Sequence, residues 1–126
     1  MSLSIQVVLV NPPSNCVNDD RVEPPLGLLY IASTLREIGY KNVSVCDLSG
    51  SLSELEVRER MGSIPNADIY GITCFCTNYK YAKEIITRIK AKNKCAYVVL
   101  GGPNPSGIPD FMYYDSCADG VIVGEG

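Results

Sequence analysis

The residues best suited to contact a ligand lie in four short segments, each of which directly follows an apolar, strand-like run. These segments span residues 11–15, 74–78, 101–105 and 124–126. They are rich in Gly, Pro, Asn and Thr, which form tight loops whose backbone can come close to a bound molecule. If the preceding runs are parallel strands of one sheet, all four segments meet at its carboxyl edge, where open α/β sheets bind their ligands.

The side chains of the protein offer little for catalysis. The chain contains no histidine among its 126 residues, which excludes Ser-His-Asp and Cys-His arrangements. Cys74 and Cys76 are too few for a zinc or iron–sulfur site, which takes about four ligands. We therefore interpret this pair as packing residues of the loop, and we predict neither a catalytic residue nor a metal ligand.

Composition and charge exclude several classes of protein. Apolar residues make up 46% and charged residues 20% of the chain, as in folded globular domains. A net charge of −3 argues against a nucleic-acid surface, which needs a basic patch. No apolar run approaches the roughly 20 residues that cross a membrane, and no signal peptide is visible. We predict a cytoplasmic protein that binds neither nucleic acid nor membrane.

The six cysteines also favour the cytoplasm. Without a secretory signal, an even number of cysteines does not predict disulfides. Cys46, Cys74 and Cys95 lie in or beside apolar runs, where a thiol behaves as a small hydrophobic side chain. We predict that these three thiols are reduced and buried.

Apolar runs alternate with amphipathic stretches along the whole chain. Short β-branched runs predict buried strands, and apolar residues at helical spacing predict helices. Gly39 is placed to end the first helix in a left-handed conformation, and Ser53 with Glu56 forms a capping box that begins the second. The predicted strands span 5–10, 43–47, 68–74, 96–100 and 120–123, and the predicted helices span 26–38, 53–61, 78–92 and 108–114.

Five strands separated by helical segments predict a parallel sheet with helices on both faces. The commonest order of five such strands is 2-1-3-4-5. We therefore predict a single α/β, doubly wound domain over residues 1–126. Because the chain ends directly after a strand, we expect it to be part of a longer protein. The apolar stripes of the two longest helices are Leu28, Ile31, Ala32, Leu35 and Ile38 in the first, and Ala82, Ile85, Ile86 and Ile89 in the third.

The first loop, Asn11-Pro12-Pro13-Ser14-Asn15, excludes several well-known sites on such a sheet. A dinucleotide site places Gly-x-Gly-x-x-Gly here, and a P-loop places a Lys-Ser/Thr pair after glycines. A flavodoxin has a Thr/Ser-rich phosphate loop at this position. A phospho-receiver has an acidic pair directly after strand one, whereas Asp19 and Asp20 lie too far along the chain.

Five blocks of sequence instead resemble the cobalamin-binding domain of cobalamin-dependent radical SAM proteins. Together they run through nearly the whole chain, in the order and at the spacing of that family. Any one block is a weak signal, but five in order are fairly specific. The blocks are 8–13 (VLVNPP), 25–32 (PLGLLYIA), 68–73 (DIYGIT, followed by Tyr79), 99–106 (VLGGPNPS) and 120–126 (GVIVGEG).

This resemblance implies a flavodoxin-like sheet with the corrin ring across its carboxyl edge. It also implies that the nucleotide tail of cobalamin runs down between the sheet and a helix, near strands three and four. The residues implied at the ring are Asn11, Pro12, Pro13, Leu26 and Gly27. Those implied at the tail and the lower face of the ring are Thr73, Cys74, Phe75 and Thr77. Gly101 and Gly102, with Pro103 and Asn104 beside them, would let the tail pass close to the backbone, and Gly124, Glu125 and Gly126 would form the rim.

The sequence departs from other cobalamin proteins and from relatives in the family at specific positions. Mutases and methionine synthase carry Asp-x-His-x-x-Gly after strand one, and its histidine ligates cobalt. With no histidine in this chain, cobalamin binding would be histidine-off, as in many radical SAM relatives. Relatives often carry histidine where Asn104 stands. The Cys-x-x-x-Cys-x-x-Cys motif that holds a [4Fe–4S] cluster for S-adenosylmethionine is also absent, so these cofactors would bind in a following C-terminal radical SAM domain.

The sequence leaves several functions open. The resemblance favours a cofactor domain of a radical SAM methyltransferase, with a cyclase or oxidoreductase as the alternative within the family. A degenerate domain that binds nothing and packs against its partner is a third possibility, and a flavin or nucleotide binder is disfavoured by the first loop. If the tail passes Gly101 and Gly102, a bulky residue at either position is expected to weaken cobalamin binding without unfolding the domain.

Overall fold

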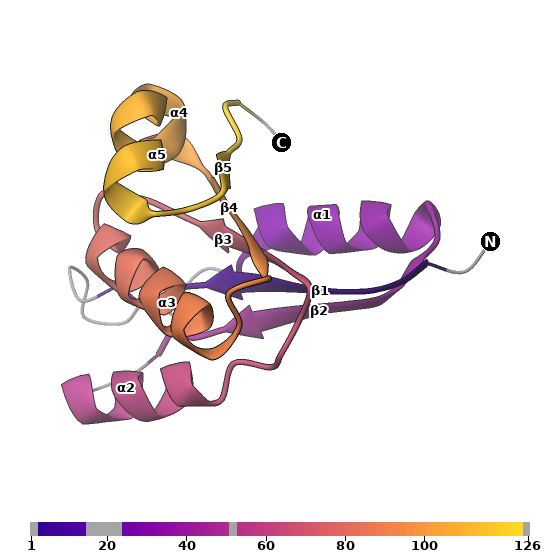
Figure 1. Cartoon of the computed structure of the whole chain (residues 1–126), viewed down its shortest axis with the longest axis horizontal. Coiled ribbons are helices and arrows are strands. Elements are labelled where there is room, and N and C mark those ends of the chain that lie inside the picture. Colours follow the sequence, from indigo (N-terminus) through magenta and orange to yellow (C-terminus); the bar gives the residue numbers. More distant parts are fainter. Residues whose placement is uncertain (1–2, 15–23, 51–52, 125–126) are drawn as a thin grey trace.

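The structure, a computed structural model, describes residues 3–14, 24–50 and 53–124. It contains a five-stranded, all-parallel sheet in the order β2-β1-β3-β4-β5, so the predicted order is confirmed (Figure 1). The strands are β1 (Leu3–Asn11), β2 (Tyr40–Asp47), β3 (Ile69–Thr73), β4 (Tyr97–Gly101) and β5 (Gly120–Val121). The helices are α1 (Leu26–Glu37), α2 (Glu54–Gly62), α3 (Tyr79–Lys92), α4 (Pro103–Gly107) and α5 (Pro109–Ser116).

The predicted elements are all present, and one helix was not predicted. The segment after β4 was expected to be a loop, but it forms the short helix α4. The strand predicted over 120–123 ends at Val121. Gly39 has the left-handed φ of 112° that a helix terminus favours, and the Ser53 side chain accepts a hydrogen bond from Glu56 N at 3.2 Å. The capping residues at both positions therefore act as the sequence predicts.

The main hydrophobic core lies on one face of the sheet, under α2 and α3. Ala82, Ile85, Ile86 and Ile89 of α3 are all buried, as predicted, and they pack with residues of β1, β3 and β4. Met112 of α5 joins the same cluster. Strands β1, β3 and β4 contribute Val8, Val10, Tyr70, Ile72, Val98 and Leu100.

A smaller core lies on the opposite face, under α1. Leu28 and Ala32 of α1 are buried against Val7, Leu9 and Val43 of β1 and β2. The prediction for Ile38 is wrong, because this residue follows the last turn of α1 and is 63% exposed. Helix α1 therefore covers the β1–β2 half of its face.

The burial predicted for the cysteines is correct for one of three thiols. Cys74 is fully buried, Cys46 is half-buried and Cys95 is exposed. The prediction for Cys95 is wrong because this residue lies in the turn before β4 rather than in the strand. Burial raises the pKa of Cys46, although Arg60 nearby opposes this effect.

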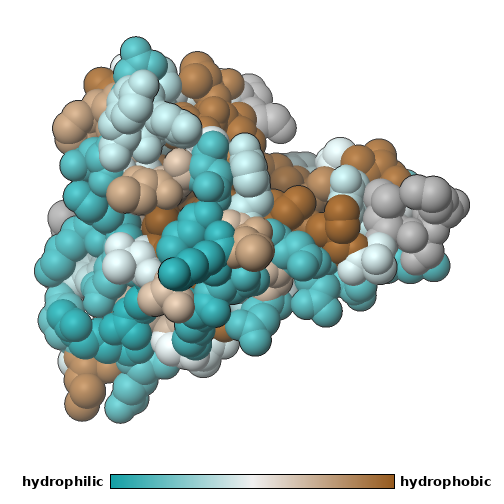
Figure 2. Space-filling model, viewed as in Figure 1, coloured by the Kyte–Doolittle hydropathy of each residue, from teal (hydrophilic) through white to brown (hydrophobic). Residues whose placement is uncertain are grey.

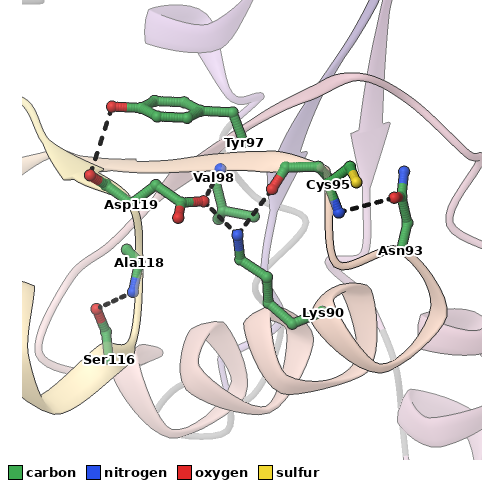
Figure 3. A network of polar contacts seen from close by, with 9 residues as sticks. Lys90, Asn93, Cys95, Tyr97, Val98, Ser116, Ala118 and Asp119 are labelled. Carbon is green, nitrogen blue, oxygen red and sulfur yellow. Dashed lines mark hydrogen bonds and ion pairs between the residues drawn. The ribbon is translucent and has the colours of Figure 1, made fainter.

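A polar network joins α3 to the amino ends of β4 and β5 (Figure 3). Lys90 of α3 donates to the Ala96 carbonyl at 2.7 Å and to the Asp119 carboxylate, which also accepts from Val98 N at 2.8 Å. Burial alone would raise the pKa of Asp119, but the hydrogen bonds from Lys90 and Val98 lower it below its ordinary value. This network fastens α3 to β4 and to the start of β5.

Two further contacts join the helices on the main-core face. Tyr79 of α3 donates to Asp115 of α5, and Lys83 pairs with the same carboxylate at 3.1 Å. Burial and the hydrogen bond to Asp115 raise the pKa of Tyr79, whereas this hydrogen bond lowers the pKa of Asp115. Within the described residues, none of the helices combines the length and apolar character needed to cross a membrane.

Candidate ligand site at the carboxyl edge of the sheet

A pocket of about 870 Å³ lies on the α1 face, at the carboxyl ends of β1, β3 and β4. Its volume is within the range of about 300 to 1,000 Å³ that is typical of ligand sites. Residues of β1, β3 and β4 form the floor, the start of α1 forms one wall, and α4 with Gly124 forms the other. The position agrees with the edge at which open α/β sheets bind ligands.

Many of the predicted site residues line this pocket. Those that do are Asn11, Pro12, Leu26, Gly27, Thr73, Phe75, Thr77, Gly101, Gly102, Pro103 and Gly124. Pro13 is buried and does not line the pocket. Asn104 lies in α4, and its side chain is outside the described part of the structure, as are Glu125 and Gly126. The four segments singled out by the sequence therefore converge on one pocket, as far as they are described.

The Cys74 side chain lies away from the pocket. It is fully buried in the main core on the opposite face, although its backbone N donates to Gly101 O at 2.7 Å. Cys76, two residues later, is exposed. Cys74 thus packs as a core residue and links the ends of β3 and β4 through its backbone.

The floor of the pocket is an apolar trough that contains a glycine at its centre. In the register of the sheet, Gly71 of β3 lies between Leu9 of β1 and Val99 of β4. A Cβ atom on Gly71 would lie 2.8 Å from Leu9 Cδ2, so the Leu9 side chain leans over the space that Gly71 leaves. Because Gly71 has no side chain of its own, it adds no atoms to the centre of the pocket floor.

The sheet remains open beyond α1. Val99 of β4 is half-buried. On the same face, Tyr97 of β4 is 50% exposed and Ile122, which follows β5, is 42% exposed. Figure 2 shows apolar residues in brown between the part of the molecule that carries α4 and α5 and the part that carries α1. A large, flat ligand can therefore lie partly in the pocket and partly over the open sheet.

The pocket is uncharged over its whole described lining. It contains no Asp, Glu, Lys or Arg among the described residues, and its polar groups are amides and hydroxyls. These are Asn11, Ser14, Ser49, Thr73, Thr77, Asn78 and Ser106. Such a lining suits a ligand with a large apolar body and neutral hydrogen-bonding groups, and it lacks the cations that usually hold a phosphate chain.

The loops around the pocket are held by their own hydrogen bonds. The buried Asn78 accepts a hydrogen bond from Phe75 N at 2.8 Å through its side-chain oxygen, which fixes the turn between β3 and α3. The Ser106 hydroxyl accepts from Gly124 N at 3.0 Å and ties the segment after β5 to α4. These hydrogen bonds hold the turn after β3 and the segment after β5 in place at the margin of the pocket.

Gly101 and Gly102 have different roles in the structure. Gly102 has a φ of 109°, and a Cβ atom there would lie 2.8 Å from Cys74 O. A Cβ atom at Gly101 would have open space around it, with Ile122 Cβ 4.0 Å away. The expectation that a bulky residue at either position leaves the fold intact is therefore wrong for Gly102, where the backbone itself requires glycine.

Sequence reasoning missed the floor of the pocket. Leu9, Gly71 and Val99 each lie two residues before a predicted site residue, namely Asn11, Thr73 and Gly101. Because side chains alternate along a strand, residues two apart face the same side of the sheet. This alternation is a signal that could have identified the floor from the sequence.

The described residues contain no group of three or more His, Cys, Asp or Glu side chains that could hold a metal ion. The five described cysteines are free thiols. The arrangement can therefore hold and orient a ligand, and no described lining residue has a side chain suited to general acid–base catalysis.

Comparisons with known proteins agree with this geometry. Among solved structures, the response regulator DrrB of Thermotoga maritima, an OmpR/PhoB homologue, is similar with a TM-score of 0.57 at 14% identity, over 94% of this chain and 45% of that one. At this identity the likeness concerns the fold alone.

Sequence relatives lead further. A protein of Pyrococcus horikoshii described as an uncharacterized methyltransferase is 32% identical over 128 residues, which cover 97% of this chain and 27% of that protein. The chain thus spans about a quarter of the length of this relative. The family model of the B12 binding domain matches residues 16–126. The chain belongs to the B12-binding domain family.

Proposed function

We propose that this chain holds cobalamin, with no histidine ligand to cobalt, as the cofactor domain of a radical SAM methyltransferase. The observation that carries the proposal is the large, uncharged pocket at the carboxyl edge, which has an apolar floor and amide and hydroxyl groups at its margin. Cobalamin matches this lining, because its corrin ring is broad and apolar and its periphery bears neutral carboxamides. Family membership supports the same ligand.

The protein contributes placement, and the cofactor contributes the chemistry. When bound, cobalamin supplies a cobalt centre that can carry a methyl group. Leu9, Gly71 and Val99 would form an apolar bed, and the segments that begin at Asn11, Thr73 and Gly101 would border the cofactor. By excluding water and fixing the cofactor, these residues would present it to a substrate held elsewhere.

The histidine-off mode is supported by the sequence. The chain has no histidine, and the residues after β1 are Asn11-Pro12-Pro13 rather than a cobalt-ligating motif. Resemblance to radical SAM proteins and the methyltransferase relative support the parent enzyme, with a C-terminal domain that holds a [4Fe–4S] cluster and S-adenosylmethionine. We propose a cytoplasmic enzyme, in which thiols such as Cys74 stay reduced.

The test is an absorbance titration with hydroxocobalamin and methylcobalamin, followed by desalting to remove free cofactor. We expect about one cobalamin retained per chain, bound in the pocket at the carboxyl edge, with the base-off spectrum of cobalamin that has lost its own lower ligand. Loss of all cofactor from this chain, and from any longer polypeptide that contains it, contradicts the proposal. A retained flavin in the purified protein would also contradict it.

A second function is favoured by a specific observation, the open half of the sheet. Tyr97, Ile122 and Val123 are exposed beside the pocket and could pack against another protein element. In that case the domain is a non-binding interaction module of the same parent enzyme. The titration separates the two functions, because a packing surface does not retain cobalamin after desalting.

A further inference from the structure

We infer that Asp47 is a positioning residue, which turns the side-chain amide of Asn11 so that its carbonyl oxygen faces the pocket. The inference rests on the proposed function and deepens it, because it states which chemical group of the ligand is recognised at the margin of the pocket beside Asn11. The group is a primary carboxamide, which donates N–H, as opposed to a carboxylate, which cannot. Asp47 was not among the residues singled out from the sequence.

The contact between the two side chains fixes the orientation of the amide. Asn11 ends β1 and Asp47 ends β2, and the register of the sheet pairs them directly. Asn11 Nδ2 donates to Asp47 Oδ1 at 2.9 Å. An ionised carboxylate only accepts hydrogen bonds, so the nitrogen of the Asn11 amide, and not its oxygen, must point to Asp47.

The pocket lies at the other end of the same amide. Asn11 lines the pocket, whereas Asp47 does not. Asp47 engages one of the two N–H groups of Asn11 Nδ2, and Oδ1 is the acceptor of this side chain. Because the contact turns the nitrogen toward Asp47, we expect Oδ1 to face the pocket and to accept a hydrogen bond from the ligand.

Asp47 is exposed, but both its side chain and its backbone have hydrogen-bond partners. Its Oδ1 also accepts from Ser49 N at 3.0 Å, and its backbone carbonyl accepts from Arg60 Nη2 at 2.9 Å. Arg60 of α2 further donates to Ser49 O at 2.8 Å. Leu48 N donates to Asn11 O at 2.9 Å, so the backbone of the two strand ends is joined as well. The carboxylate thus acts as a fixed support for the Asn11 amide.

This arrangement predicts that the site distinguishes a ligand with a neutral carboxamide from the same ligand with a charged carboxylate. A carboxamide N–H of the corrin periphery would find Asn11 Oδ1 as its acceptor. A carboxylate at the same place would meet that oxygen and the negative charge of Asp47 behind it, and both interactions are repulsive. A site that reads an N–H strongly disfavours an analogue without one.

The first experiment is a double-mutant cycle on the affinity for hydroxocobalamin. We expect Asp47→Ala to raise the Kd about tenfold in the unsubstituted background, because the Asn11 amide is then free to turn. In the Asn11→Ala background, Asp47→Ala is expected to change the Kd less than about twofold. Equal losses in both backgrounds overturn the inference, because Asp47 would then act without Asn11.

A conservative variant guards against a purely structural effect. Asp47→Asn keeps an oxygen that can accept from Ser49 N and Asn11 Nδ2, so we expect its affinity and its thermal midpoint to equal those of the unsubstituted chain.

Hydroxocobalamin derivatives with single peripheral amides hydrolysed to carboxylates supply the second readout. At least one of them should bind about tenfold more weakly than hydroxocobalamin itself, and Asp47→Asn should reduce this penalty. No discrimination among the derivatives contradicts the inference.

A readout without cofactor separates this inference from the proposed function. In the ¹H–¹⁵N spectrum of the free chain, the side-chain amide of Asn11 should shift in Asp47→Ala and stay in place in Asp47→Asn. Failure of the unsubstituted chain, and of any longer polypeptide that contains it, to retain hydroxocobalamin contradicts the proposed function alone. An Asn11 amide resonance that is unchanged in Asp47→Ala contradicts the positioning role, whatever the outcome of the titration.

Discussion

The two faces of the sheet differ in how completely they are covered. On the face under α2 and α3, Ile85, Ile86, Val98 and Leu100 are fully buried. On the other face, α1 covers β1 and β2, while Val99 of β4 stays half-buried and Tyr97 is half-exposed. The pocket lies on this second face, next to the edge of α1.

This difference indicates that one face of the sheet stabilises the fold and the other binds the ligand. Burial of apolar side chains is the main source of folding stability, so the α3 face stabilises the fold. The α1 face gives up part of that burial and retains room for a ligand. Substitutions on the two faces should therefore separate stability from ligand binding.

The largest expected effect on stability is in the covered core. Ile86→Ala removes a fully buried side chain, and we expect it to lower the free energy of unfolding by about 3 kcal/mol. Val99→Ala, its match on the pocket face, removes a half-buried side chain and should cost about 1 kcal/mol or less. Urea unfolding measures both. Equal losses would show that the two faces contribute alike and would break the comparison.

The next effect concerns ligand binding on the open face. Gly101→Leu projects a side chain beside Ile122 at the pocket, so we expect at least about tenfold weaker hydroxocobalamin binding and little change in stability. Gly102→Ala should instead lower the free energy of unfolding by about 1 to 3 kcal/mol, because its φ is 109° and Cys74 O is close. A Gly101→Leu variant that is folded and binds normally contradicts the proposed path of the ligand.

The sequence predicted the fold well because its signals are local. Alternating apolar runs, the left-handed Gly39 and the Ser53 cap each specify an element without knowledge of the rest of the chain. Helix α4 was missed because Pro103 and Pro105 indicate a loop, although proline is tolerated in the first turn of a helix. The burial of Cys95 was wrongly predicted because this residue lies in an exposed turn two residues before β4, and nearness to an apolar run does not by itself bury a side chain.

The candidate site was only partly predictable. The carboxyl-edge rule brought Asn11, Thr73 and Gly101 together correctly, because it follows from parallel topology alone. The pairing of Asn11 with Asp47 depends on the register of β1 against β2, which no local pattern specifies. Gly102 has a positive φ and lies close to the Cys74 backbone, whereas Gly101 does not, and the Gly-Gly motif alone does not distinguish the two positions.

A smaller effect is expected at the amino end of the covered face, where Asp119 accepts from Lys90 and Val98. Its lowered pKa stabilises the fold above the unfolded value of about 3.9, and this contribution is lost as the pH falls through the folded value. We expect Asp119→Asn to lower the free energy of unfolding by about 1 kcal/mol at pH 7. Below about pH 4 the variant and the unsubstituted chain should become equally stable.

Urea unfolding at several pH values measures this gap. Glu59→Gln, at an exposed position of α2 away from the first turn of the helix, is the control with the same change in charge and should leave stability nearly unaltered. A cost of Asp119→Asn that stays constant from pH 7 to pH 3 would show that the charge of Asp119 is not what holds α3 to β4.

The smallest effect is expected where α2 meets α3 on the same face. The Tyr81 hydroxyl donates to Glu54 at 2.6 Å, and this hydrogen bond, together with burial, raises the pKa of Tyr81 to about 12. The resulting stabilisation is fully present below the unfolded value of about 10 and is lost as the pH rises through the folded value. Tyr81→Phe should therefore cost about 0.5 to 1 kcal/mol at pH 8, and the difference should shrink between pH 10 and 12. Tyr97→Phe, on the open face, is the control and should change the free energy of unfolding little at pH 8. A larger loss in Tyr97→Phe than in Tyr81→Phe would show that the open face, and not the covered face, carries the stabilising contacts.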